Sequence, residues 1–232
     1  MTDQSFWYLD NIDLFGLLCP NKLSETDVTS HQSKTFKKGS NIYLPDDEAD
    51  KIYFINDGRI KIGVYGNGGK EIIKAILTKG EVFGELAMIG HNKRRDFAFA
   101  MEDTSVCMIT LDELKILMKE NSSLQLFLMK VIGNRVLSVE RRLESLVFKD
   151  SRSRIVEYLL ELAQTRGQRV GYEMLVRKFN THQEIANLTA TSRQTVTTIL
   201  NELRTRNLIT FDRKRLLIRD LEKLEKEALI AA

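Results

Sequence analysis

The hydrophobic pattern of the first half of the chain has the short period of β-strands. From about residue 35 to 110, apolar and polar residues alternate in brief runs such as KIYFINDGRIKIGVY, which begins at Lys51. This alternation predicts half-buried strands, and the KEIIKAIL run after a GNGG turn predicts the returning strand of a hairpin. No long helix fits this region. The pattern therefore predicts an antiparallel jelly roll or barrel.

A helical period takes over from Leu111. After the short segment LDELKILMKE, Ser122 is placed to cap a helix that runs to about Phe148. At ~1.5 Å per residue this helix is about 40 Å long, which is more than a small β-roll covers. Apolar residues recur along it at alternating spacings of three and four, which is a heptad seam. The seam consists of Met129, Ile132, Val136, Val139, Leu143 and Leu146.

We interpret the seam as the interface of a homodimer, in which the helix packs against its own copy across a two-fold axis. Packing within one chain is the alternative. A second stripe of Phe127, Leu128 and Val131 is expected to face the β-roll. Asp150 or Ser151 can cap the next helix, RIVEYLLELAQ, so we place a hinge near residues 149–150.

The stretch THQEIANLTATSRQTVTTILNELR predicts a helix-turn-helix. Thr181 with Glu184 forms a capping box for a first helix that ends near Leu188, and Ser192 caps a second helix after a short turn. Ala190 falls where the turn commonly uses glycine, and a left-handed alanine costs roughly 1 kcal/mol. The second helix has an apolar face made of Val196, Ile199, Leu200 and Leu203.

The opposite face of the second helix carries side chains that suit the major groove of DNA. Arginine pairs with guanine, glutamine with adenine, and the threonine methyl group contacts that of thymine. These residues are Arg193, Gln194, Thr197, Thr198 and Asn201. Thr181, His182, Ser192 and the N–H groups of both helix starts are placed to hold phosphates.

The segment LITFDRKRLLIRD predicts a β-hairpin wing after the second helix. Its charged turn includes Arg213, Lys214 and Arg215, which either contact the DNA backbone or form a solvated loop. The fold class is therefore α+β, in three parts: a β-roll sensor domain with flanking helices over residues 1–121, a dimerisation helix and hinge over 122–149, and a winged helix-turn-helix domain over 150–232.

Charge and cysteine content agree with an intracellular DNA-binding protein. From Ser151 onward there are 15 Lys and Arg against 10 Asp and Glu, a net charge of +5, which indicates an anionic partner. Cys19 and Cys107 are interpreted as reduced core residues of a cytoplasmic protein. The N-terminus has no signal-peptide pattern, and no apolar run is long enough to span a membrane, so no membrane partner is expected.

The order of these motifs resembles the family of the cyclic-AMP receptor protein and FNR, which are bacterial transcription regulators. NIDLFGLL is similar to the family's N-terminal segment, YFINDGRIKIGVYGNGGKEIIKAILTKGEVFGELAM to its β-roll, and HQEIANLTATSRQTVTTILNELR to its DNA-reading motif. The resemblance implies a homodimer that binds a pseudo-palindromic promoter site and works with RNA polymerase. Its half-sites lie about 34 Å apart, one turn of DNA.

The resemblance also places an effector pocket in FGELAMIGHNKRRDFAFA. The matching residues are Gly84, Glu85, Leu86, Arg94 and Arg95. Asp96 puts a negative charge where a phosphate needs donors, and Val139 and Glu140 stand where the cyclic-AMP receptor protein has a Thr-Ser pair. These changes argue against cyclic AMP, and leave open another small or anionic effector or none. In the alternative without an effector, the GEL segment is only structural, a capped turn in which Glu85 is expected to pair with Arg94.

At the second helix, Arg193 matches the family's guanine-reading arginine. Gln194 stands where the cyclic-AMP receptor protein has glutamate, and Thr198 where it has a second arginine. Since glutamate favours cytosine and glutamine favours adenine, we expect the half-site to differ at these base pairs.

Other chemistries find little support in the sequence. An iron–sulfur cluster needs four cysteines, and the spacing of His31 and His91 marks neither as a haem ligand. A cupin-type metal enzyme needs a histidine cluster, so we expect neither catalytic nor metal-ligating residues. The remaining alternative is a cyclic-nucleotide module that regulates a protein partner, but the C-terminal motif favours DNA.

Overall fold

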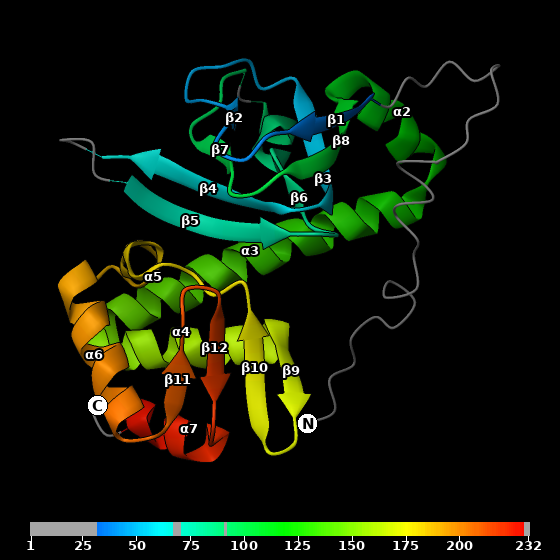
Figure 1. The fold of residues 1–232 in the computed structure, drawn as a ribbon. Coiled ribbons are helices and arrows are strands. Elements are labelled where there is room, and N and C mark those ends of the chain that lie inside the picture. The colour runs from blue at the N-terminus through cyan, green and yellow to red at the C-terminus, as the bar shows by residue number, and fades with distance from the viewer. Residues whose placement is uncertain (1–31, 67–70, 91, 230–232) are drawn as a thin grey trace. The chain divides into compact units, whose positions relative to one another are not determined.

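A computed structural model describes residues 32–66, 71–90 and 92–229 of the chain (Figure 1). It divides into two compact units, Met1–Leu137 and Ser138–Ala232. We describe each unit by itself. The resembling segment NIDLFGLL and the expected helices before the roll lie outside the described residues.

The first unit is built on two four-stranded antiparallel sheets, in the orders β1-β8-β3-β6 and β2-β7-β4-β5. Their strands are β1 (Gln32–Phe36), β2 (Asn41–Tyr43), β3 (Lys51–Asp57), β4 (Arg59–Tyr65), β5 (Glu71–Thr78), β6 (Val82–Phe83), β7 (Phe97–Ala100) and β8 (Thr104–Thr110). The antiparallel roll predicted from the alternating pattern is confirmed. The 3₁₀ helix η3 (Glu85–Ile89) interrupts the strands between β6 and β7.

The hairpin of β4 and β5 follows the sequence pattern closely. β4 and β5 pair from Arg59↔Thr78 to Tyr65↔Glu71, as the KEIIKAIL run predicts. Gly58 joins β3 to β4 at a φ of 99°, and a Cβ atom there would lie 2.3 Å from the hydroxyl oxygen of Thr104. Only glycine fits this corner, because both the backbone angle and the space exclude a side chain.

Two helices cover one side of the first unit. Thr110 and Glu113 form a capping box at the start of α2 (Leu111–Glu120), and α3 spans Ser122–Phe148, as predicted. The predicted cap of α3 is wrong by one residue: the side-chain oxygen of Asn121 accepts from the N–H groups of Ser123 and Leu124. Ser122 is already helical, and Asn is as good a capping residue.

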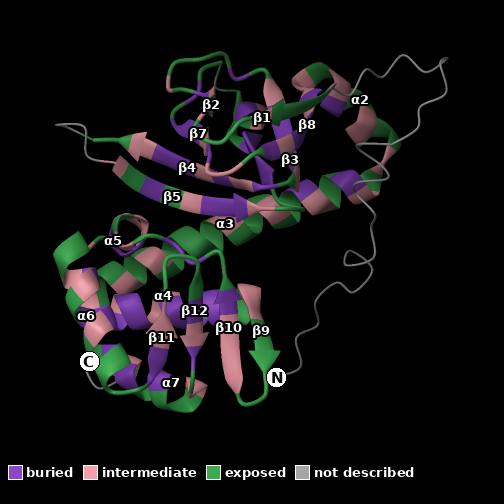
Figure 2. Ribbon diagram, viewed as in Figure 1, coloured by how far each residue is buried: buried purple, intermediate pink, exposed green. Residues whose placement is uncertain are grey.

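The face of α3 that packs on the roll is short. Leu124 and Leu128 are buried against Ile52, Phe54 and Ile109, with Phe127 and Val131 packed beside them, which confirms the second stripe. Figure 2 shows that the buried positions of α3 are confined to its N-terminal part. The six seam residues are instead exposed, with exposed fractions between 38% (Ile132) and 68% (Met129 and Val139).

The second unit packs four helices against a four-stranded antiparallel sheet of order β11-β12-β10-β9. Asp150 caps α4, which is the first of the two candidates that the sequence offered. The elements are α4 (Ser151–Arg166), β9 (Gly167–Val170), β10 (Glu173–Arg177), α5 (His182–Thr189), α6 (Arg193–Thr205), β11 (Ile209–Phe211), β12 (Arg215–Ile218) and α7 (Leu221–Leu229). Ile155, Leu159 and Val196 lie in its core.

A charged network ties the C-terminal helix to its neighbours. Glu227 of α7 is buried and accepts hydrogen bonds from Arg152 of α4 and from both terminal nitrogens of Arg206, which follows α6. Arg152 also pairs with Glu202 of α6. The pKa of the Glu227 carboxyl is lowered, because the hydrogen bonds from the two arginines outweigh its burial.

The expectation of two reduced cysteines is wrong for Cys107. This residue is buried on β8 and is disulfide-bonded. The only other cysteine of the sequence is Cys19, which lies outside the described residues. Spacing along the chain does not reveal which cysteines meet in space.

Candidate nucleic-acid interface and effector pocket

The predicted helix-turn-helix is present in the second unit. The Thr181 hydroxyl accepts from the N–H of Glu184, whose carboxylate accepts from the N–H of Thr181, so the capping box of α5 is complete. The turn contains Ala190, left-handed with φ of 51°, as expected from its place in the motif. Ser192 caps α6 by accepting from the N–H of Thr195.

Helix α6 has the two faces that its sequence predicts. Val196, Ile199, Leu200 and Leu203 are buried in the core of the unit. On the opposite face Arg193, Gln194 and Thr198 are exposed, and within the described part of the chain their side chains have no hydrogen-bond or ion-pair partner. Three side chains that suit base edges are therefore free to contact a ligand.

Thr197, by contrast, is held inside the motif. Its hydroxyl donates to the carbonyl oxygen of Arg193 at 2.9 Å and lies 2.8 Å from Nδ1 of His182. Because the single hydroxyl proton of Thr197 is donated to the carbonyl oxygen, the hydrogen bond between Thr197 and His182 must be donated by the N–H at Nδ1 of His182. Nε2 of the neutral imidazole ring is then an acceptor. Burial, followed by the charge of Arg193, lowers the pKa of His182.

The wing hairpin is also present. β11 pairs with β12 from Ile209↔Ile218 to Phe211↔Leu216, and the carboxylate of Asp212 accepts from the N–H groups of Lys214 and Arg215 in the turn. These hydrogen bonds lower the pKa of Asp212. Arg213 and Lys214 are exposed there.

Sequence reasoning missed the hairpin of β9 and β10, which completes the sheet of the wing. Its strands pair from Glu173↔Val170 to Val176↔Gly167. The signal was available as an alternating run, EMLVR, directly after a Gly-Tyr pair at residues 171–172. β10 leads directly to α5 and so sets where the helix-turn-helix begins.

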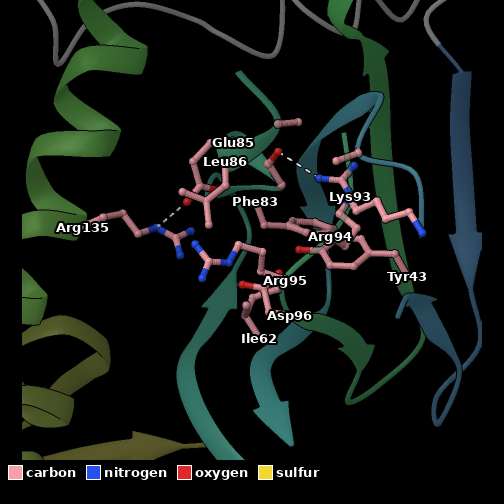
Figure 3. A pocket seen from close by; sticks show the side chains of 13 residues that line it. Tyr43, Ile62, Phe83, Glu85, Leu86, Lys93, Arg94, Arg95, Asp96 and Arg135 are labelled. Atoms are coloured by element: carbon pink, nitrogen blue, oxygen red, sulfur yellow. Dashed lines mark hydrogen bonds and ion pairs between the residues drawn. The ribbon is translucent and has the colours of Figure 1, made fainter. Parts of the chain in front are cut away.

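The candidate effector pocket lies beside η3 in the first unit (Figure 3). All five effector residues taken from the resemblance line it, together with Tyr43, Asp96 and Arg135. Gly84 begins η3 with φ of 77°, and a Cβ atom there would lie 2.9 Å from a terminal nitrogen of Arg94. A side chain at position 84 would therefore displace the arginine.

Arg94 forms part of the wall of this pocket. It is 5% exposed, its Nη1 donates to the carbonyl oxygen of Gly84 at 3.1 Å, and its Nη2 donates to that of Lys51 at 2.5 Å. Its guanidinium carbon lies 4.5 Å from the ring centre of Tyr43 and 5.6 Å from that of Tyr53, a cation–π arrangement. Both terminal nitrogens are thus engaged by backbone carbonyls.

The expected pairing of Glu85 with Arg94 is wrong. Glu85 is buried and pairs with Arg135 of α3, at 3.5 Å between Oε1 and Nε, while Nη2 of Arg135 donates to the carbonyl oxygen of Val82. Arg135 was missed, although helical spacing places it on the same face as Leu128 and Val131. Figure 3 shows the guanidinium groups of Arg135 and Arg95 directed toward the same side of the pocket.

These residues do not fit a cyclic nucleotide in the arrangement that the structure has. The open volume of the pocket is about 30 Å³, room for one or two water molecules. Asp96 is buried in its wall and pairs with Lys74 at 2.9 Å, so a carboxylate stands where a phosphate needs donors. The arginine expected to meet the phosphate, Arg94, is already bonded to carbonyl oxygens.

Two further features bear on the alternatives. In the described parts of the chain, no group of three or more His, Cys, Asp or Glu side chains is arranged to hold a metal ion. Among the same residues, no helix combines the length and apolar character needed to cross a membrane.

Comparisons with known proteins agree with both halves of this arrangement. Residues 33–121 match the family described as cyclic nucleotide-binding domain, and residues 153–227 match the Crp-like helix-turn-helix domain; together they cover more than half of the chain. A global nitrogen regulator of Nostoc sp. is 29% identical over 80% of this chain and 84% of its own. A CRP-like cAMP-activated global transcriptional regulator of Mycobacterium tuberculosis is 28% identical over 85% and 88%.

Among solved structures, a mutant of CooA from Carboxydothermus hydrogenoformans superposes with a TM-score of 0.79 at 27% identity, and covers 94% of this chain and 96% of its own. The order of β-roll, long helix and helix-turn-helix is thus shared over nearly the whole chain. The chain belongs to the CRP/FNR family of bacterial transcription regulators.

Proposed function

We propose that the protein is a homodimeric, sequence-specific DNA-binding regulator whose α6 helices enter the major groove at two half-sites of a pseudo-palindromic promoter. One observation carries this proposal: both helices of the helix-turn-helix are capped, and the outer face of α6 presents three side chains without internal partners in the described chain, namely those of Arg193, Gln194 and Thr198. Arg193 is assigned to guanine and Gln194 to adenine, according to the hydrogen-bonding edges that they complement. Thr181, Ser192, Arg213 and Lys214 are assigned to the phosphates.

The dimer is supported by the exposed seam of α3. Six apolar residues at heptad spacing form a continuous stripe with no partner inside the described chain. Apolar side chains in such a stripe are stabilised by an equivalent helix, and a symmetric pair of helices holds two recognition helices at a fixed spacing. Two half-sites about 34 Å apart would then be read together. As a regulator of this family it would act in the cytoplasm, with RNA polymerase as its further partner.

For the effector, we propose a small anion in place of cyclic AMP. Arg95 is exposed at the pocket, and its guanidinium group and that of Arg135 are directed toward the same side of it (Figure 3). The two carboxylates that line the pocket are already paired, Glu85 with Arg135 and Asp96 with Lys74. Guanidinium groups bind carboxylate and phosphate oxygens with paired hydrogen bonds. Because the pocket is small, such a ligand must open it. A regulator that needs no effector is the alternative, and DNA binding by ligand-free protein at full affinity would favour it.

DNA selection from a randomised pool tests the function. Wild-type protein is expected to enrich a two-fold symmetric motif, and Arg193→Ala is expected to lose most of its affinity for that motif, since one bidentate arginine–guanine contact contributes about 1–3 kcal/mol. Arg219→Ala is the matched control, because Arg219 is exposed directly after β12 and lies outside α6. Enrichment of no motif, or equal affinity of Arg193→Ala and wild type, would contradict the proposal.

A further inference from the structure

Two arginines face each other on the sheet of the second unit. Arg177, the last residue of β10, is the registered partner of Arg215, the first residue of β12. Both are exposed, while their neighbours Val176 and Leu216 are buried. Because side chains alternate along a strand, the two arginines lie together on the outer face of the sheet.

This pairing is unfavourable in the free protein. Like charges directly opposite on antiparallel strands repel each other. The carboxylate of Asp212, which is in the same turn, accepts from the backbone N–H groups of Lys214 and Arg215, and its charge attracts Arg215 without forming a side-chain hydrogen bond or ion pair. Neither Arg177 nor Arg215 has a side-chain ion pair or hydrogen bond in the described part of the chain. The pair thus keeps ten guanidinium N–H donors available for an anion from outside.

The pair also lies at the end of the sheet from which the helix-turn-helix begins. The N–H of Phe179, two residues after Arg177, donates to the carbonyl oxygen of Lys214 at 3.0 Å. The ring of Phe211 lies 6.2 Å from that of Phe179 and 5.8 Å from that of His182, the first residue of α5. In Figure 1, β10 ends and β12 begins at the end of the sheet beside α5.

We propose that Arg177 and Arg215 together bind one phosphate of the DNA backbone, at a point on the wing sheet separate from the contacts of α6. The chemistry is the recognition of a phosphate diester by paired guanidinium groups, which fixes the register of the protein on the duplex without reading sequence. The proposal rests on the function proposed above. It explains why repulsion across the strand pair is tolerated: the partner that neutralises it is the nucleic acid.

The test is the salt dependence of DNA binding. Affinity of the full-length protein for its selected site is measured over a range of potassium chloride concentrations, for wild type and for the double variant Arg177→Gln and Arg215→Gln. Each phosphate contact contributes about 0.9 to the slope of log affinity against log salt concentration, so loss of one contact per subunit should make the slope of a dimer less steep by about 2. The affinity should fall by the same factor for different selected sequences.

Arg169→Gln is the matched control, because Arg169 is exposed on the edge strand β9, opposite Met174 and three residues along β10 from Arg177. It should leave the slope unchanged. Thermal unfolding without DNA checks the fold, and the double variant should be at least as stable as wild type because a like-charge pair is removed. An unchanged slope in the double variant, or an equal change in the control, would overturn the phosphate site while DNA binding itself stands. Wild-type protein that selects no DNA would overturn the proposed function as well.

Discussion

The Nε of Arg154 donates a hydrogen bond of 2.9 Å to the carbonyl oxygen of Thr189, the last residue of α5. The same guanidinium group reaches the carbonyl oxygen of Ala190 at 3.4 Å and that of Lys149 at 2.7 Å. Lys149 directly follows α3, so one side chain at the start of α4 joins the ends of α3 and α5. Carbonyl groups at helix ends lack helical partners, and a cation there satisfies them.

Replacement of Arg154 should therefore weaken both the fold and DNA binding. Hydrogen bonds to a charged group contribute about 1.5–3 kcal/mol each, and not additively, so Arg154→Met is expected to lower the free energy of unfolding by about 2–3 kcal/mol. Urea unfolding measures this, and Arg154→Lys should recover part of it. If Arg154 positions α6, the methionine variant should lose more affinity for a DNA with two half-sites than for a DNA with one. A domain that is only destabilised should lose affinity for both DNAs equally.

Ala190 should gain stability as glycine. At φ of 51° its Cβ is crowded by the backbone, and glycine avoids this cost. Ala190→Gly is expected to raise the free energy of unfolding by about 1 kcal/mol, measured in urea. Ala186→Gly is the control: Ala186 is buried within α5, where glycine should destabilise. A loss of stability in the first variant would contradict the strain argument.

DNA binding should become tighter as the pH falls if His182 holds a phosphate. The folded protein lowers the pKa of His182 below its usual 6.5, so the ring is neutral at pH 7 and its Nε2 cannot donate. A phosphate contact then requires uptake of a proton. Affinity should rise as the pH is lowered from about 7.5 toward 5.5, by at most ~10-fold per pH unit for each histidine.

The effect on stability has the opposite sign. Because the unfolded histidine binds protons more readily, stability at this site is present above pH 6.5 and is lost as the pH falls through and below that value. His182→Gln, whose amide donates at every pH, should bind DNA with a flatter pH profile. Equal profiles for the two proteins would show that His182 takes no part in phosphate binding.

Charges placed on the seam of α3 should separate the dimer. Val136→Glu and Leu143→Glu each put a carboxylate into the proposed apolar interface, and sedimentation velocity should then report a monomer. Arg141→Glu is the control, because Arg141 is exposed and lies off the seam. Monomeric wild-type protein would exclude the dimer at once. Loss of the dimer should also lower affinity for a two-half-site DNA, because one subunit no longer brings the second to its half-site.

Gln194→Glu should change the preferred base pair at one position of each half-site. Glutamate accepts a hydrogen bond from the amino group of cytosine, whereas glutamine pairs with adenine. Gln194 is exposed and unengaged, so this substitution disturbs no internal contact. Selection from a randomised pool with both proteins measures the change; identical motifs would show that position 194 does not read a base.

Much of the fold follows from local patterns, because caps and periodicity act over a few residues. Ser192 and Val196 placed α6 correctly, and the helical pattern predicted an α3 that runs to about Phe148, where it ends. Contacts between segments that are distant in the sequence were harder to predict. The partner of Glu85 lies on another element, Arg135, and nothing near Glu85 in the sequence points to it. The disulfide at Cys107 was missed for the same reason, since spacing contains no information about three-dimensional proximity.

The inward position of Arg94 separates two tasks of the β-roll. The guanidinium group of Arg94 lies between the rings of Tyr43 and Tyr53 and donates to two backbone carbonyl oxygens. The positive charge in this part of the roll therefore belongs to the protein itself and does not depend on a ligand. Arg95, which is exposed at the pocket, can therefore diverge to suit a new chemical signal without removing the cation that the interior depends on. In a fold of this kind, the residues that recognise the ligand can change while the residues that stabilise the fold stay the same.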